Sequence, residues 1–227
     1  MARTLNAAVH AVRREAFVDA AQGLIQAKGY EQMSVQDVLD QLEASRGAFY
    51  HYFDSKAALL EAVVERMVET AMAALAPMLA DPELSAPVKL ERLFSGIAGF
   101  KAERQDLVLA LIEVWLSDDN AIVREKLRQD NAVHLTPLLA AIVRQGNAQG
   151  AFSASSPDQT ARVLVSLLQG ASEMATELFV ARRANRIPFE AVEPTLAAYS
   201  EAFDRVLGIP DGSLTIVDAA VLRHWFG

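Results

Sequence analysis

Four residues in one short segment have side chains suited to contacting a nucleic acid: Arg46, Gly47, Tyr50 and His51. An arginine can bond guanine in a bidentate way in the major groove, while tyrosine and histidine reach phosphates or base edges. A glycine lets the backbone come close to its neighbour. Folding a small helical unit does not need this combination, so the segment predicts a DNA-contacting surface.

Two short helices must position these side chains. In the first, Val35, Val38, Leu39 and Leu42 recur at the three- and four-residue spacing of one helix face, after a possible N-cap at Ser34. This pattern predicts an amphipathic helix that ends near residue 42.

The second helix follows after a connection of about three residues, the length expected in a helix-turn-helix. Ser45 offers its N-cap, and Phe49 and Phe53 lie four residues apart, so both can pack against the first helix. The pair predicts a helix-turn-helix over residues 34–53.

Flanking helices complete this unit. Apolar residues over 13–28 repeat at helical spacing and end at Gly29, which is predicted to be the C-cap. Asp54 and Ser55 can cap another helix that begins near Lys56 and runs towards Pro77. A lysine at a helix N-terminus adds positive charge where phosphate already binds well.

The rest of the chain is predicted to be helical too, over 88–101, 104–117, 120–146, 158–183 and 189–207. We therefore predict an all-α fold with no strand. The expected domains are a DNA-binding domain over 1–56, a larger helical effector-binding and dimerisation domain over 57–208, and a tail with a short helix over 209–227.

Composition excludes several classes of protein. The 227 residues are 52% hydrophobic, enough for a substantial core, and with no cysteine there is no disulfide or thiolate site. No apolar run looks long enough to span a bilayer and no signal peptide is evident, so a cytoplasmic protein without membrane contact is expected. The net charge is −8, but residues 1–56 hold six basic and seven acidic residues, so the acidic excess lies elsewhere.

Signatures of catalysis are missing from the sequence. We find no nucleophile elbow, phosphate loop or dinucleotide fingerprint, and the four histidines lack metal-ligand spacing. We therefore expect no catalytic residue, no metal and no cofactor.

The N-terminal quarter of the chain resembles the TetR family of bacterial transcriptional regulators. The shared motifs are R-E-A-F-V-D-A-A-x-x-L-I from Arg14, K-G-Y at 28–30, M-S-V at 33–35, S-R-G-A-F-Y-H-Y-F at 45–53 and S-K at 55–56. The resemblance implies a homodimer that binds a palindromic double-stranded operator through two recognition helices. It also implies a small molecule that binds the C-terminal domain and alters the spacing of the two DNA-binding heads.

The resemblance also assigns residues by position. Those facing the bases or the nearby backbone would be Arg46, Gly47, Ala48, Tyr50 and His51. Those holding phosphates would be Ser34, Gln36, Ser45, Tyr52 and Lys56.

Two positions depart from the family pattern. Glu43 stands where the family usually has glycine, and a non-glycine residue in a left-handed conformation costs about 1 to 2 kcal/mol, so a slightly rearranged turn is expected. Ala48 replaces a common threonine or serine, so one polar contact is lost and its methyl group could touch a thymine methyl instead.

The two helices over 158–183 and 189–207 are unusually apolar, which favours a four-helix bundle with a second subunit over a purely intrachain core. A small, largely apolar effector is expected in the second domain. Its candidate lining is Phe94, Phe100, Leu107, Leu111, Trp115, His134, Leu138, Met174 and Phe179. Helical apolar stripes are more often ordinary core, however.

The leading hypothesis is a ligand-responsive DNA-binding regulator, most simply a repressor. One alternative is an all-α enzyme or small-molecule-binding protein that retains the N-terminal module as a scaffold. Another is a regulator whose effector is a protein, or which has no effector.

Overall fold

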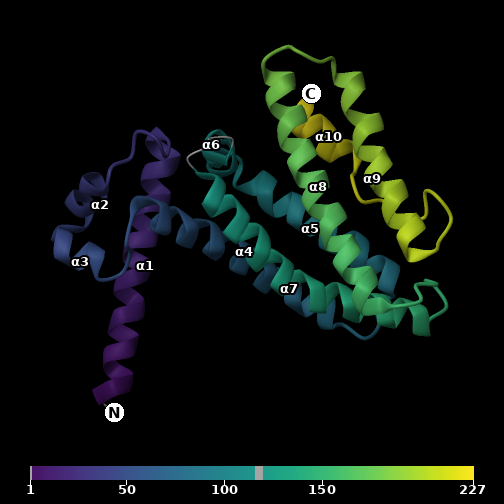
Figure 1. The fold of residues 1–227 in the computed structure, drawn as a ribbon, viewed down its shortest axis with the longest axis horizontal. Coiled ribbons are helices and arrows are strands. Elements are labelled where there is room, and N and C mark those ends of the chain that lie inside the picture. The colour runs from purple at the N-terminus through teal and green to yellow at the C-terminus, as the bar shows by residue number, and fades with distance from the viewer. Residues whose placement is uncertain (1, 116–119) are drawn as a thin grey trace. The chain divides into compact units, whose positions relative to one another are not determined.

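The computed structural model describes residues 2–115 and 120–227, with side chains described over 9–112 and 120–227, and no strand occurs in these ranges. The prediction of an all-α fold is confirmed (Figure 1). The helices are α1 (Ala2–Lys28), α2 (Val35–Leu42), α3 (Arg46–Tyr50), α4 (Lys56–Ala80), α5 (Ala86–Glu103), α6 (Gln105–Trp115), α7 (Ala121–Ala148), α8 (Pro157–Arg183), the 3-10 helix η2 (Phe189–Ala191), α9 (Val192–Leu207) and α10 (Ala219–Phe226).

The chain divides into two compact units. The first comprises residues 1–72 and 101–127, and the second comprises 73–100 and 128–227. Helix α4 contributes residues to both units, and α6 belongs to the first unit, where it packs against α1.

Helix α1 is longer than its apolar pattern predicts, because it begins at Ala2 rather than near residue 13. It ends where expected: Gly29 has a φ of 80°, the left-handed conformation that glycine adopts without strain, and its N–H donates to the Ile25 carbonyl at 2.9 Å.

Helix α2 begins with a capping box. The Asp37 N–H donates to Ser34 Oγ at 3.1 Å, while the Ser34 N–H donates to Asp37 Oδ2 at 2.6 Å. Lys28 Nζ lies 2.8 Å from Asp37 Oδ1. The lysine, followed by the bonds from Ser34, holds the pKa of the Asp37 carboxyl well below its usual range.

The turn after α2 contains a non-glycine residue in the left-handed region. Glu43 has φ 49° and ψ 42°, and the N–H of Ala44 donates to the Leu39 carbonyl at 2.9 Å. The backbone here therefore adopts the conformation that a glycine would take, despite the Cβ of Glu43.

Aromatic rings form the centre of the first unit's core. Phe17 and Phe49 are both fully buried, with ring centroids 5.8 Å apart, and Phe53 lies 5.8 Å from Phe49. Leu107 and Leu111 of α6 join the same core. The core thus unites α1, α3 and α6 around one aromatic cluster.

Helix α4 begins at a cap that the sequence predicts. Ser55 Oγ accepts the N–H of Ala58 at 3.0 Å. The helix continues past Pro77 to Ala80 instead of ending before the proline. Pro77 has no N–H to donate to the carbonyl four residues earlier, so the last turn of α4 continues with one backbone hydrogen bond fewer.

In the second unit, α8 and α9 lie side by side (Figure 1). Phe203 of α9 is fully buried and its ring lies 5.2 Å from that of Phe94 in α5. Buried Asp204 accepts the N–H groups of Gly212 and Ser213 at 2.6 and 3.1 Å, which fixes the start of the C-terminal tail. The short helix predicted in that tail is α10, which packs against α8 and α9.

Helix α8 is long and apolar enough to cross a membrane by length and composition, so the expectation that no such segment exists is wrong. A core or interface helix of a globular protein can have the same composition. Only 17% of its most apolar window is buried within the chain, so most of this apolar surface needs another partner or remains open.

We predict that Glu43→Gly stabilises the first unit. The substitution removes the left-handed strain but adds freedom to the unfolded chain, so the net gain is about 0.5 to 1 kcal/mol. Slower hydrogen exchange of α2 and α3 amides in the full chain would show it. Glu43→Ala keeps a Cβ at this position and is the matched control; equal protection in both variants would contradict the strain argument.

We predict that Asp37→Asn destabilises α2 at neutral pH and that this loss disappears in acid. A carboxyl with a depressed folded pKa contributes stability above its unfolded pKa, and that contribution is lost as the pH falls towards the folded value. The gap in urea midpoint between wild type and variant, followed by circular dichroism, should therefore be wider at pH 7 than at pH 3.

Asp40→Asn serves as the control for that measurement, because Asp40 accepts one exposed bond from Gln36 at 2.7 Å and does not cap the helix. A gap for Asp37→Asn that is independent of pH would show that the carboxylate charge is not the stabilising feature.

Candidate nucleic-acid interface

The recognition segment is anchored on one side and open on the other. Ser45 caps α3 by accepting the Ala48 N–H on its Oγ at 3.2 Å. Phe49 faces the core, while Arg46, Gly47 and His51 are exposed and Tyr50 is 57% exposed. The four side chains or positions expected to contact DNA therefore share an open surface.

Two of the expected contact residues are partly covered by the protein itself. Ala48 and Tyr52 are half-buried and pack against the first unit's core. The Tyr52 ring lies 5.6 Å from that of Phe17. Tyr52 is thus a supporting ring as well as a group near the exposed surface.

The residues assigned to phosphate contacts surround this surface and already have local partners. Ser34 Oγ takes part in the capping box, and Gln36 Nε2 donates to Asp40 Oδ1 at 2.7 Å. Both residues are exposed. Their local bonds fix the side chains in place near the start of α2.

Lys56 lies over an aromatic ring at the start of α4. Its Nζ is 4.1 Å from the centroid of the Tyr30 ring and donates to the Glu31 carbonyl at 3.4 Å. Burial lowers the pKa of Lys56 and, with nearby Glu31, raises the pKa of Tyr30 to about 12. The tyrosine hydroxyl thus stays neutral and able to donate a hydrogen bond.

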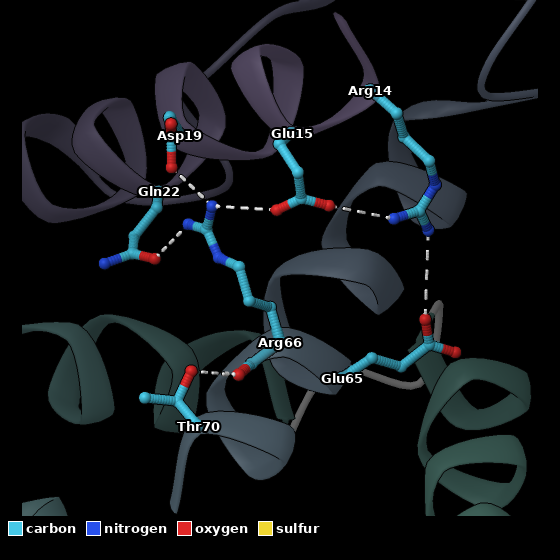
Figure 2. Close-up of polar contacts among 7 residues, drawn as sticks. All are labelled: Arg14, Glu15, Asp19, Gln22, Glu65, Arg66 and Thr70. Carbon is cyan, nitrogen blue, oxygen red and sulfur yellow. Dashed lines mark hydrogen bonds and ion pairs between the residues drawn. The ribbon is translucent and has the colours of Figure 1, made fainter. Parts of the chain in front are cut away.

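A polar cluster joins α1 to α4 behind this surface. Figure 2 shows Arg66 of α4 reaching the side chains of Glu15, Asp19 and Gln22 on α1. Its Nη1 lies 3.5 Å from Glu15 Oε2 and its Nη2 donates to Gln22 Oε1 at 2.5 Å. We call this group the Arg66 cluster.

Arg14 extends the Arg66 cluster. Its guanidinium lies 3.5 Å from Glu15 and 4.0 Å from Glu65 of α4, and over the ring of Phe53 at 5.2 Å. Burial and the neighbouring Glu61 raise the pKa of the Glu65 carboxyl. Arg14 therefore serves to join helices rather than to project into solvent as a helix-start charge would.

One part of this surface is not apparent from the motif. His10 of α1 places its ring 4.6 Å from the Tyr52 ring and 5.3 Å from the His51 ring. Spacing could have revealed it, since His10 lies seven residues before Phe17 and such positions share a helix face.

The expected effector residues fall into different parts of the molecule. Leu107 and Leu111 lie in the first unit's core because α6 packs against α1. The side chain of Trp115 lies outside the described residues.

The other expected effector residues belong to the second unit. Phe94 packs on Phe203, and Phe179 packs on Trp225 and Phe226 of α10 at 6.2 and 6.3 Å. His134 is exposed. The remaining members are half-buried: Phe100, Leu138 and Met174.

Comparison with known proteins agrees with this geometry. The family described as bacterial regulatory proteins, tetR family, matches residues 17–63, which contain α2, α3 and the start of α4. An HTH-type transcriptional regulator in the lacX 3' region of Lactococcus lactis subsp. lactis is 39% identical over 56 residues. That match spans 25% of this chain but only 29% of the relative's length.

Longer matches extend beyond the helix-turn-helix. The HTH-type transcriptional repressor DhaR of Mycobacterium sp. (strain GP1) is 24% identical over 159 residues, covering 70% of this chain and 79% of that protein. The crystal structure of a TetR transcription regulator from Haloarcula marismortui shares the fold with a TM-score of 0.61 at 18% identity, covering 87% and 97% of the two chains. Residues 17–63 thus match the tetR family of bacterial regulatory proteins, and the chain shares the fold of a TetR transcription regulator with an N-terminal helix-turn-helix.

Proposed function

We propose that this regulator is a repressor that binds a palindromic operator as a homodimer and is released by a small molecule. The observation that carries the proposal is the exposed surface of α3. Arg46, Tyr50 and His51 are exposed there, while buried Phe49 holds the helix against the core. A relative that matches 70% of the chain is named a repressor, which supports the direction of regulation.

Base contacts come from the exposed face of α3 in this proposal. Arg46 bonds a guanine edge, Tyr50 and His51 reach bases or adjacent phosphates, and Gly47 allows close approach. Gln36, Ser45 and Lys56 contact the phosphates on either side, with Ser34, Ala48 and Tyr52 shaping the surface. Two copies of α3 then enter successive major grooves, about 34–36 Å apart.

Dimerisation is assigned to α8 and α9. Most of α8's apolar window is not buried within the chain, and Val163 on this helix is 47% exposed. A second copy of the same helix pair can cover this surface with apolar contacts of its own. The proposal gives α8 no role in a membrane, because a helix at a dimer interface can have the same apolar composition.

The effector is proposed to be a small, largely apolar molecule that binds among the half-buried side chains of Phe100, Leu138 and Met174 in the second unit. It acts by binding one of two states more tightly, namely the state in which the heads do not match the operator spacing. Helix α4 contributes to both units and is the natural connection between them.

We predict that Arg46→Ala weakens binding to the selected operator by about 1 to 3 kcal/mol and relaxes base preference at one position in each half-site. The operator is first selected from random duplexes with the wild-type chain, and affinity is then measured by fluorescence anisotropy at fixed salt. Arg186→Ala is the control, since it removes the same charge from an exposed site in the second unit. Equal affinity of wild type and Arg46→Ala on every duplex would refute the assignment of α3.

We predict that Val163→Arg dissociates the dimer. A guanidinium buried at the proposed interface without a partner should raise the dimer dissociation constant by roughly tenfold to a hundredfold. Analytical ultracentrifugation over a range of concentrations measures this change. Gln26→Arg adds the same charge at an exposed position of α1 in the first unit, away from α8 and α9, and should leave the dimer intact. A wild-type chain that sediments as a monomer would remove the basis of the homodimer.

A further inference from the structure

The N-terminal half of α1 contacts the end of the recognition helix. His10 lies outside the matched region 17–63, yet its ring is tilted by 49° against the Tyr52 ring at 4.6 Å. It also meets the His51 ring edge-on at 5.3 Å, and His51 and Tyr52 meet each other at 5.0 Å. These three rings, which we call the His10 triad, are mutually in contact.

Two residues of α1 contact the Tyr52 ring. Phe17 contacts the Tyr52 ring at 5.6 Å from the core, and His10 contacts it from seven residues earlier on the same helix face. Ring contacts of this kind have preferred geometries, so they restrict the rotamers of both partners. Exposed His51 thereby contacts α1 through the His10 ring.

Burial alone does not explain this part of α1. Val9 and Val12 are 61% and 72% exposed, and they line an open hollow together with Arg13 and Tyr52. Two exposed valines beside the triad contribute little to a hydrophobic core. The ring contacts of His10 are what connect this turn of α1 to α3.

We propose that His10 is a positioning residue for operator recognition: through ring contacts it sets the orientation of His51 and Tyr52, and so the base preference at the end of α3. This inference rests on the proposed DNA-binding function. It extends the DNA reader to a residue that precedes the matched family region. His10 itself needs no contact with DNA for this role.

The test compares full-length wild type with His10→Ala, His10→Phe and His51→Ala. Each protein is used to select duplexes from a random library, and affinity for the wild-type operator and for an unrelated duplex is measured at several salt concentrations. Ala11→Ser, at a neighbouring exposed position of α1, is the control for general disturbance of the helix. Thermal unfolding should be unchanged, because His10 is exposed.

We expect His10→Ala to broaden base preference at the positions that His51→Ala broadens, and to lower the ratio of specific to non-specific affinity by about two- to tenfold. The salt dependence should stay the same, because no phosphate contact is lost. His10→Phe, which keeps an aromatic ring, should restore the wild-type preference. The double variant His10→Ala/His51→Ala should show no broader preference than His51→Ala alone.

Two results would overturn the inference. One is an unchanged base preference in His10→Ala while wild type binds specifically. The other is a shallower salt dependence in both His10→Ala and His10→Phe, which would make His10 a direct phosphate contact. A wild-type chain that selects no sequence at all would instead refute the proposed function, and is recognised before any variant is compared.

Discussion

The reading surface depends on the burial of one phenylalanine. Helix α3 spans only Arg46–Tyr50, and a helix of this length is not stable by itself in water. Phe49 is fully buried against Phe17 and Phe53, so its side of α3 is fixed to α1. Its neighbours Arg46 and Tyr50 are exposed on the surface of α3 that the core does not cover. Removing the aromatic contact would therefore disturb all the exposed residues of α3 together, rather than a single one.

Polar side chains also join the two longer helices α1 and α4. The Arg66 cluster joins α4 to α1, and Arg14 adds a contact with Glu65 and with the Phe53 ring. Helix α4 also contributes Leu59, Leu60 and Val63 directly to the aromatic core beneath α3, and it continues into the second unit. The polar bonds of Arg66 and the apolar contacts of α4 therefore both attach α4 to the first unit.

The helices could be predicted from the sequence largely because their apolar residues repeat at helical spacing and their caps are strong. Ser34, Ser45, Ser55 and Gly29 all lie at helix ends. Spacing cannot say which of several similar apolar stripes pack together, so it does not predict that Leu107 and Leu111 lie in the first unit's core. Nor does it say how far a helix extends beyond its buried stripe: Val9 and Val12 repeat at helical spacing in the first turns of α1, but both are exposed.

The Arg66 cluster also affects how the salt dependence of DNA binding is interpreted. Its acidic partners are open to solvent, with side-chain exposures of 49% for Glu15 and 71% for Asp19, so dissolved ions screen their attraction to Arg66. Added salt thus acts on the joint between α1 and α4 as well as on phosphates. The slope of DNA affinity against ionic strength then includes a contribution from this solvent-exposed contact within the protein, in addition to the cations released from the DNA.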